Sequence, residues 1–430
     1  MPGSPPHTPS SSADEVRRTL DQVTRRERGR LIAGLVRLLG AQQVALAEDV
    51  AQEAVLKALA SWPYKGLPDN PGGWLARVAQ RCAIDRLRRE QREVALETPS
   101  ADAGVQGVNE LASRIDDPQL RLMLLCCDDV LSAQDRVGLT LRLVAGFTAR
   151  EIAQVLLVSE VSLAQRLARA KRRLHTHDGL ADAPRGARAI EARLPSVRKT
   201  LYLMFSLGYS PRSGATLIRS DVALEAVRLA EGLLACTSDS ASGADTAALT
   251  ALICLQASRL NARADAEGRP IRLQDQDRSR WDRPLMARGL TLLAGAARQT
   301  HTLSPYHLEA AIAAEHATAA TWETCDWLRI RRHYAALEAA TGSPVVTINS
   351  CVAQAMAGDS DAALTRIQAL ADLHPLQTYA PFHFAVAEIA RLAERREVVI
   401  AAYRRALACP TSTPVAQTLS ARLSDSLERA

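Results

Sequence analysis

The chain has 430 residues, of which 47% are hydrophobic and only 4% are aromatic. This length predicts two or three domains, and the net charge of +6 is compatible with a polyanionic partner. The 8 cysteines form no CxxC pair, which favours buried thiols of a reducing cytoplasm over disulfides or a zinc site. No apolar run is long enough to span a bilayer. We therefore expect a cytoplasmic protein without metal, cofactor or membrane partner.

Three helices are predicted before residue 93. Residues 1–12 are rich in Pro and Ser and are expected to be disordered. Ser12 and Glu15 form a capping box at the start of a helix that should end near Leu39. The second helix, at about 45–61, should bury Leu46, Val50, Ala54 and Leu59. Its outer face is acidic, which indicates either a solvated surface or a docking face for a basic partner helix. This face comprises Glu48, Asp49, Gln52 and Glu53.

A loop and a basic helix should follow. Residues 62–73, WPYKGLPDNPGG, are rich in Pro and Gly and predict an ordered loop. A third helix should begin near Trp74 and carry arginines on its outer side. Basic charge beside aromatic side chains suits single-stranded or melted nucleic acid. A structural turn followed by a solvated arginine-rich helix is the alternative. The helix is expected to turn Trp74, Val78, Ile84 and Leu87 inward.

An acidic linker is predicted at 93–117, where the composition changes abruptly. Helices at 119–130 and 132–145 should lead into residues 146–174, GFTAREIAQVLLVSEVSLAQRLARAKRRL. This stretch predicts two short helices joined by a tight turn. Thr148 with Glu151 makes a capping box for the first helix, and Ser159 caps the second.

The second of these helices has one apolar and one basic side. Its apolar positions recur at helical spacing, and polar side chains near its start and basic ones near its end suit base edges and phosphates. This layout is typical of a helix-turn-helix recognition unit, and an amphipathic pair with a solvated basic face is the alternative. The residues expected inside are Leu163, Leu167, Ala170 and Leu174. The candidate DNA contacts are Ser159, Ser162, Gln165, Arg166, Arg169, Lys171, Arg172 and Arg173.

The remainder, 187–430, is also predicted to be helical, so we expect an all-α chain. Residues 345–373 and 382–408 look like helix hairpins of a repeat that buries its face against a neighbour. The polar cluster QDQDRSRWDR, 274–283, would suit an enzyme if its aspartates were acid–base or metal groups. However, no ligand spacing or nucleophile motif accompanies it, so we favour a salt-bridged network around Trp281. The cluster comprises Asp275, Asp277, Arg278, Arg280, Trp281 and Asp282.

Several stretches together resemble a bacterial RNA polymerase sigma factor of the extracytoplasmic-function (ECF) type. LAEDVAQEAVLKAL and WLARVAQRCAIDRLRR resemble sigma region 2, and 146–174 resembles region 4. The resemblance implies region 2 at 13–92, a linker at 93–117 and region 4 at 118–178. YLMFSLGYSPRSG, LQDQDRSRWDRPLMARG, SPYHLEAAIAAEHA and SPVVTINSCVAQAMAGD resemble the extension of a subgroup with a C-terminal TPR-like helical domain, here 187–430.

This resemblance implies a function in transcription. The chain would bind core RNA polymerase and direct promoter recognition, DNA melting and transcription initiation. It would not be an enzyme itself. A protein or small-molecule regulator would act through the C-terminal domain. The alternatives are a helix-turn-helix regulator with a TPR-like sensor domain that acts without polymerase docking, and an enzyme that uses the aspartate cluster.

The resemblance also assigns residues. Asp49, Gln52 and Glu53 would dock on the clamp helices of the largest polymerase subunit, and the flap of the second-largest subunit is a further partner. The acidic linker resembles the segment that threads towards the polymerase active-site cleft, with a plain tether as the alternative. Many relatives carry an aromatic residue at the position of Val55 and an Asn at the position of Arg81. The departure at Arg81 leaves the base preference at the minus-ten element open. Residues 146–174 would read the minus-thirty-five element. Minus-ten DNA would contact Trp62, Asn70, Trp74, Arg77, Arg81, Arg88 and Arg89.

Overall fold

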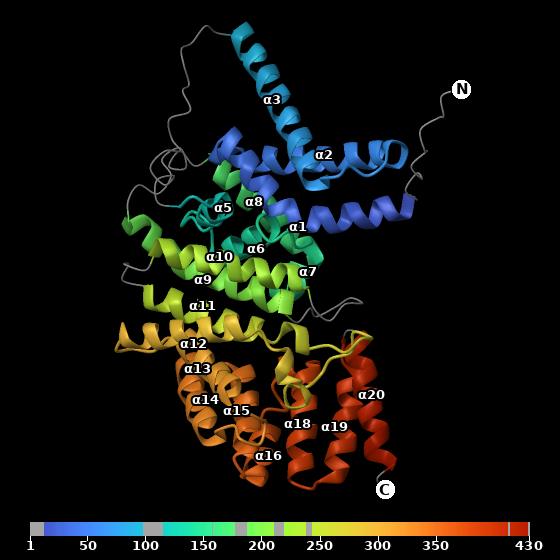
Figure 1. Cartoon of the computed structure of the whole chain (residues 1–430), viewed down its shortest axis with the longest axis vertical. Helices are drawn as coiled ribbons and strands as arrows, with labels where there is room; N and C mark the ends of the chain where they lie inside the picture. Colours follow the sequence, from blue (N-terminus) through green and yellow to red (C-terminus); the bar gives the residue numbers. More distant parts are fainter. Residues whose placement is uncertain are drawn as a thin grey trace, which may run out of the picture. The chain divides into compact units, whose positions relative to one another are not determined.

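The computed structural model describes residues 13–97, 115–156, 158–176, 187–209, 219–237, 243–411 and 413–428. Within these ranges the chain forms nineteen α-helices and a few short 3₁₀ turns (Figure 1). The β-structure of the described residues is one isolated bridge, between Ala264 and Pro270. The prediction of an all-α chain is therefore confirmed. The expected disordered start, 1–12, lies outside the described residues.

The helices form two compact units, residues 1–200 and 201–430. The first unit begins with three helices that pack on one another, α1 (Ala13–Leu39), α2 (Val44–Lys65) and α3 (Pro71–Glu97). The buried side of α2 is rich in alanine, which lets its neighbours approach closely. Those alanines are Ala47, Ala51, Ala54 and Ala58.

The prediction of a loop at 62–73 is wrong at both ends. Helix α2 continues to Lys65, because Trp62 is 1% exposed and anchors its last turn in the core. Gly66 ends the helix with a φ of 81°, and α3 already begins at Pro71, where a missing backbone N–H costs nothing. Only residues 66–70 connect the two helices.

The inner face of α2 also differs from the prediction. Glu48, expected on the acidic outer face, is 4% exposed, whereas Leu59, expected inside, is 38% exposed. Val50 and Ala54 are buried as predicted, and the buried side also takes in Val44, Ala47, Glu48 and Ala51. On α3, likewise, the most buried residues are Leu75, Ala79, Cys82 and Ala83, and the predicted Trp74, Val78, Ile84 and Leu87 are half-buried.

The second half of the first unit contains the predicted helix-turn-helix. Helices α5 (Pro118–Cys126) and α6 (Ala133–Leu143) precede α7 (Ala149–Leu156) and α8 (Glu160–Thr176). The Thr148–Glu151 capping box is confirmed, since Glu151 N donates to Thr148 Oγ1 at 3.2 Å and Thr148 N donates to Glu151 Oε2 at 2.7 Å. The four predicted apolar positions of α8 are also confirmed as buried: Leu163, Leu167, Ala170 and Leu174.

Both ends of the predicted linker are ordered. Helix α3 extends to Glu97, and the Asp117 carboxylate accepts from Gln119 N at 2.8 Å as the N-cap of α5. Residues 98–114, which hold most of the expected linker, lie outside the described residues.

Helix α9 (Ala187–Tyr209) extends the first unit beyond residue 178, the expected end of region 4. Arg193 forms an ion pair with Asp128 and donates to Leu124 O at 3.1 Å, and Leu194 and Val197 are fully buried. The beginning of α9 is therefore part of the core around α5 and α6.

The second unit starts with three helices packed around a buried fourth. α10 (Ser220–Thr237), α12 (Arg283–Arg298) and α13 (Pro305–Thr318) all pack on α11 (Gly243–Ala257), which is buried along most of its length. The remaining helices are α14 (Trp327–Thr341), α15 (Pro344–Met356), α16 (Ser360–Gln368), α17 (His374–Gln377), α18 (Ala380–Leu392), α19 (Arg396–Ala408) and α20 (Thr413–Glu428), with 3₁₀ turns at Leu260–Ala262, Leu273–Asp275 and Arg278–Arg280.

Two successive hairpins repeat with a period of 36 residues. Helices α15 and α18 begin at 344 and 380, and their partners α16 and α19 begin at 360 and 396. The turns match as well: Asp359 N donates to Gln354 O at 3.2 Å, and Arg395 N donates to Ala390 O at 2.8 Å. Gly358 and Glu394 occupy the same left-handed position, with φ of 96° and 58°. The two predicted hairpins are confirmed, and they are copies of one structural unit.

No helix among the described residues is both long and apolar enough to cross a membrane.

Candidate nucleic-acid interface

The residues of α8 that were predicted to contact DNA fall into two groups. Ser162, Gln165, Arg169, Arg172 and Arg173 are exposed, and their side chains have no partner among the described residues. Arg166 is held by Asp135 at 2.8 Å and by Gln134 at 2.9 Å. Ser159 Oγ accepts from Ser162 N at 3.2 Å, as an N-cap does. The first group is therefore the part of the helix that is free to contact a duplex.

Lys171 belongs to neither group, because it ends in a buried ionic network centred on Glu48. Arg28 Nη2 lies 2.6 Å from Glu48 Oε1, Arg142 Nε lies 3.2 Å from the same oxygen, and Lys171 Nζ binds the other oxygen. The Glu48 side chain is only 5% exposed. The network thus joins α1 and α2 to α6 and α8.

The charge of Glu48 is maintained by its neighbours. Burial alone would raise the pKa of Glu48, but Lys171, Arg28 and Arg142 together hold the pKa below the usual value for a glutamate. Burial and the nearby Arg142 lower the pKa of Arg28. Because Lys171 cannot bind Glu48 and a DNA phosphate at once, its predicted contact with DNA requires this network to open.

The outer face of α2 presents polar and apolar groups together. Asp49 and Gln52 are exposed, and their side chains have no partner among the described residues. Glu53 is half-buried and pairs with Lys57 at 3.0 Å and with Arg86 at 2.9 Å. Leu56 is 64% exposed on the same face, four residues after Gln52. The sequence analysis missed Leu56, although its spacing from Asp49 and Gln52 places it beside them.

A hollow of about 430 Å³ lies between the end of α2 and the start of α3. Tyr64 stands at its edge with 89% of its surface exposed. Trp74 forms part of the wall and packs edge-on against Trp62, with ring centroids 5.4 Å apart. Trp62 is buried and so positions Trp74 instead of facing solvent. The lining residues are Lys57, Ala60, Ser61, Tyr64, Lys65, Trp74 and Val78.

Helix α3, which begins beside this hollow, carries a row of exposed arginines. Arg77, Arg81 and Arg88 are exposed at spacings of four and seven residues, which places them on one stripe of the helix, with Arg89 beside it. Asn70 Oδ1 accepts from Gly73 N at 2.8 Å and so caps α3. Sequence reasoning missed Tyr64, Lys57 and Lys65, because their stretch was split between a helix and a predicted loop.

The cluster at 274–283 in the second unit makes structural contacts. Asp275 pairs with Arg272 at 2.5 Å, while Asp277 accepts from Ser279 N at 2.9 Å and Asp282 from Leu285 N at 3.0 Å, both as helix caps. Arg278 donates to the carbonyls of His316 and Ala319 at 2.6 and 2.9 Å.

Trp281 is 3% exposed with Arg278 over its ring, and Arg280 is exposed. The contacts of the cluster favour a structural role, and the described residues contain no group of three His, Cys, Asp or Glu side chains suited to a metal.

Two models of sigma-70 regions match parts of the first unit, and one relative matches most of the chain. A model of sigma-70 region 2 matches residues 24–93, and a model of sigma-70 region 4 matches residues 121–174. An uncharacterized protein of Rhizobium meliloti is 36% identical over 384 residues, which cover 88% of this chain and 89% of that protein. The chain belongs to the sigma-70 family. As a sigma-70 factor it acts in promoter recognition during transcription initiation.

The sigma-70 regions map onto the helices of the first unit. Region 2 covers most of α1 and α2 and α3 up to residue 93, and region 4 covers α5 to α8. A family of unknown function, DUF6596, matches residues 193–297 of this sigma factor, from Arg193 in α9 to the end of α12. No solved structure matches the chain.

Proposed function

We propose that this protein is an ECF-type sigma factor that docks on core RNA polymerase and opens promoter DNA, with its activity controlled through a TPR-like C-terminal domain. The observation that carries the proposal is the combination of three free surfaces in the first unit. These are the Asp49–Gln52–Leu56 face of α2, the hollow at Tyr64 with the arginine stripe of α3, and the exposed side chains of α8.

The α2 face suits the clamp helices of the largest polymerase subunit. A polar and acidic rim gives steering and register towards a basic partner, and an exposed leucine gives an apolar anchor. Glu53 contributes less directly, since Lys57 and Arg86 already bind it. A flap contact with the second-largest subunit through region 4 belongs to the same proposal.

The hollow between α2 and α3 suits an unstacked base of the minus-ten element. Tyr64 and Trp74 offer aromatic surfaces, and Lys65 offers charge for the backbone, whereas Lys57 is already bound by Glu53. The stripe of Arg77, Arg81 and Arg88 would follow the melted strand. Extruding a base costs a few kcal/mol, which such contacts offset.

Helix α8 would read the minus-thirty-five element in the major groove. Ser162, Gln165 and Arg169 lie nearer the start of the helix, where base edges are reached, and Arg172 and Arg173 lie near its end, where phosphates are held. Because Lys171 is bound by Glu48 in this structure, the free chain presents fewer cations than the sequence suggests.

A helix-turn-helix regulator that acts without polymerase is the second candidate. It is supported by α7 and α8 alone, and it leaves the α2 face and the hollow without a role. The two candidates differ in how tightly the free chain binds duplex DNA: a regulator binds tightly alone, whereas the sigma factor binds weakly until it is part of the polymerase complex.

Replacing Arg172 and Arg173 with alanine should weaken duplex binding equally for all sequences. The slope of log affinity against log salt should fall by about one for each arginine, because each releases about one counterion. Fluorescence anisotropy across a salt series measures both quantities, with and without core polymerase. An Arg332→Ala/Arg404→Ala pair, two exposed arginines of the C-terminal unit, is the matched control and should leave the slope unchanged. An unchanged slope in the α8 variant would contradict the phosphate assignment.

The C-terminal domain is proposed to act on the sigma regions. A truncation that tests this must retain residues up to 200, because Arg193, Leu194 and Val197 belong to the core of the first unit. Ending the chain near residue 178 would leave Asp128 buried without its arginine partner, and loss of activity would then report unfolding.

A further inference from the structure

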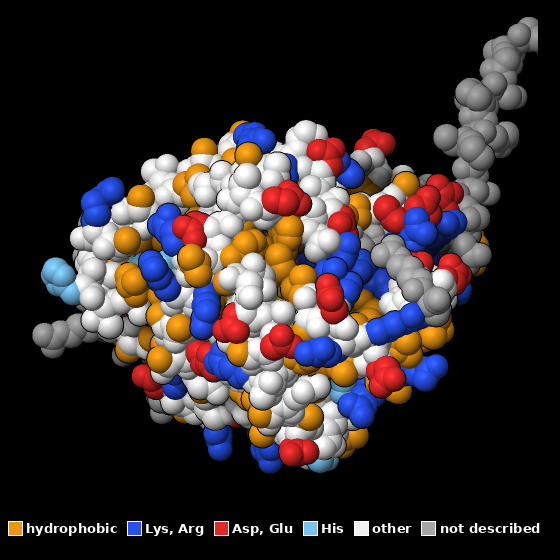
Figure 2. All heavy atoms as spheres, turned by 90° about the horizontal axis from the view of Figure 1, so that it is seen from below, with side chains coloured by type: hydrophobic (Ala, Val, Ile, Leu, Met, Phe, Trp, Pro, Cys, Tyr) orange, Lys and Arg blue, Asp and Glu red, His pale blue; other side chains and the backbone are white. Residues whose placement is uncertain are grey.

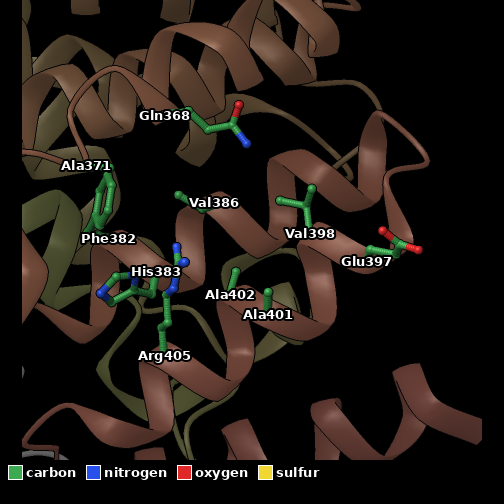
Figure 3. Close-up of a pocket in the computed structure, with 10 residues that line it drawn as sticks. All are labelled: Gln368, Ala371, Phe382, His383, Val386, Glu397, Val398, Ala401, Ala402 and Arg405. Atoms are coloured by element: carbon green, nitrogen blue, oxygen red, sulfur yellow. The ribbon is translucent and has the colours of Figure 1, made fainter.

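A cavity of about 320 Å³ lies between α16, α18 and α19 of the C-terminal unit (Figure 3). Its wall is largely apolar and includes Phe382, Val386, Val398 and Ala402. The volume equals that of about ten water molecules in the liquid, and it lies at the lower end of the range for small-molecule sites. The cavity is open to solvent where Gln368, Glu397 and Arg405 are exposed, and its apolar wall suits the body of an organic ligand.

Polar side chains stand on two sides of this cavity. Figure 3 shows the Arg405 guanidinium reaching up beside His383, with the Gln368 amide above it on the opposite side. His383 Nε2 is bonded to Gln377 O at 2.9 Å, which fixes the ring. The side chain of Arg405 makes no hydrogen bond or ion pair with the described residues. An arginine that lines a cavity and has no partner is available to an anion.

The repeat shows that the hairpin does not need this arginine. The position equivalent to Arg405 in the preceding hairpin, 36 residues earlier, is Ala369. The position equivalent to Glu397 is Asp361, which binds Arg395 at 3.1 Å, whereas Glu397 has no such partner among the described residues and points away from Arg405 in Figure 3. The arginine at this cavity is therefore an addition to the common scaffold, whereas the acidic position is shared.

We propose that this cavity binds a small organic carboxylate with an apolar body. The planar guanidinium of Arg405 matches a carboxylate with two parallel N–H···O bonds, and the amide of Gln368 supplies a further donor. Phe382, Val386 and Val398 bury the apolar part. Such a carboxylate would be the ligand of the regulatory domain, so its biological role rests on the proposed function. The binding itself does not depend on that function.

The surrounding surface argues against a nucleic acid at this site. Figure 2, seen from the end at which α16, α18, α19 and α20 lie in Figure 1, shows basic and acidic side chains interspersed. Nucleic acids are bound by surfaces of predominantly positive charge, because their phosphates dominate the affinity. A single carboxylate needs only one cation, which Arg405 provides.

The test is calorimetric titration of the full chain, without polymerase, with octanoate as the probe. We expect saturable binding at one site, and at least tenfold weaker binding to Arg405→Gln. Arg404→Gln is the matched control, since Arg404 is exposed on the same helix and does not line the cavity; its affinity should equal that of the wild type. Ala401→Phe, at an exposed lining position, should fill the cavity and abolish binding without disturbing the core.

Comparison probes complete the experiment. Octylamine, which lacks the carboxylate, and acetate, which lacks the apolar body, should each bind at least tenfold more weakly than octanoate. The proposal is overturned if octanoate shows no saturable binding at millimolar concentrations, if Arg405→Gln binds it as tightly as the wild type, or if octylamine or acetate binds equally well. Because polymerase is absent, failure here leaves promoter-dependent transcription intact and is distinguishable from failure of the proposed function.

Discussion

Replacing Glu48 with alanine is expected to lower the free energy of unfolding of the first unit by roughly 3–5 kcal/mol. The variant leaves Arg28, Arg142 and Lys171 close together with no carboxylate between them. Removing one partner from a buried ionic network costs more than the network contributed, because uncompensated charge stays out of water. Hydrogen exchange followed on peptides of α2 and α8 measures the effect within this unit of the full chain.

The control for this experiment is the neighbouring acid. Asp49→Ala removes an exposed carboxylate without a partner among the described residues, so the free energy of unfolding should change by less than about 0.5 kcal/mol. Equal protection of α2 and α8 in the Glu48 variant and the wild type would show that the network does not hold these helices together.

The effect should also depend on pH. The pKa of Glu48 is lower in the folded chain than the value of about 4.3 for an unperturbed glutamate. A carboxyl with a lowered folded pKa stabilises the fold above its unfolded pKa, and this stability is lost as the pH falls towards the folded pKa. The difference between wild type and Glu48→Gln should therefore be largest near pH 7 and shrink below about pH 4.

Reversing the charge of Asp49 is expected to weaken binding to core RNA polymerase by about a hundredfold or more. Placing a cation against a basic docking surface costs several kcal/mol, and each 1.4 kcal/mol is a factor of ten. Asp49→Arg should leave the fold intact, because Asp49 is exposed and has no described partner. Titration of labelled sigma factor with core polymerase measures the dissociation constant.

Two further variants sharpen this prediction. Leu56→Ser should also weaken polymerase binding, because Leu56 is the apolar group beside Asp49 and Gln52. Asp372→Arg makes the same charge change at an exposed position of the C-terminal unit and should leave the dissociation constant unchanged. If Asp49→Arg binds polymerase as tightly as Asp372→Arg, the docking face lies elsewhere.

The sequence predicted what depends on local spacing. The caps at Thr148 and Ser159 and the buried stripe from Leu163 to Leu174 act within a few residues, and all are present in the structure. The hairpins at α15–α16 and α18–α19 likewise follow from helical periodicity and turn residues.

What the sequence could not predict depends on distant partners. Glu48 looks like a surface acid, and only the convergence of Arg28, Arg142 and Lys171, up to 123 residues away, makes its burial favourable. Lys171 and Arg166 were expected to face DNA because their partners are also distant in the sequence. Glu48 binds Lys171 and Asp135 binds Arg166 only in the folded chain. Arg193 similarly extends the first unit through Asp128, 65 residues earlier.

Promoter-dependent initiation by core RNA polymerase is the decisive test of the proposed sigma-factor function. The full chain is added to purified core polymerase with duplex DNA that carries family-like minus-ten and minus-thirty-five elements, and short initiating transcripts are quantified. We expect transcripts that require the chain, require both elements and disappear with Asp49→Arg. Tight binding of the free chain to the duplex with no transcript would contradict this function and support a regulator that acts without polymerase.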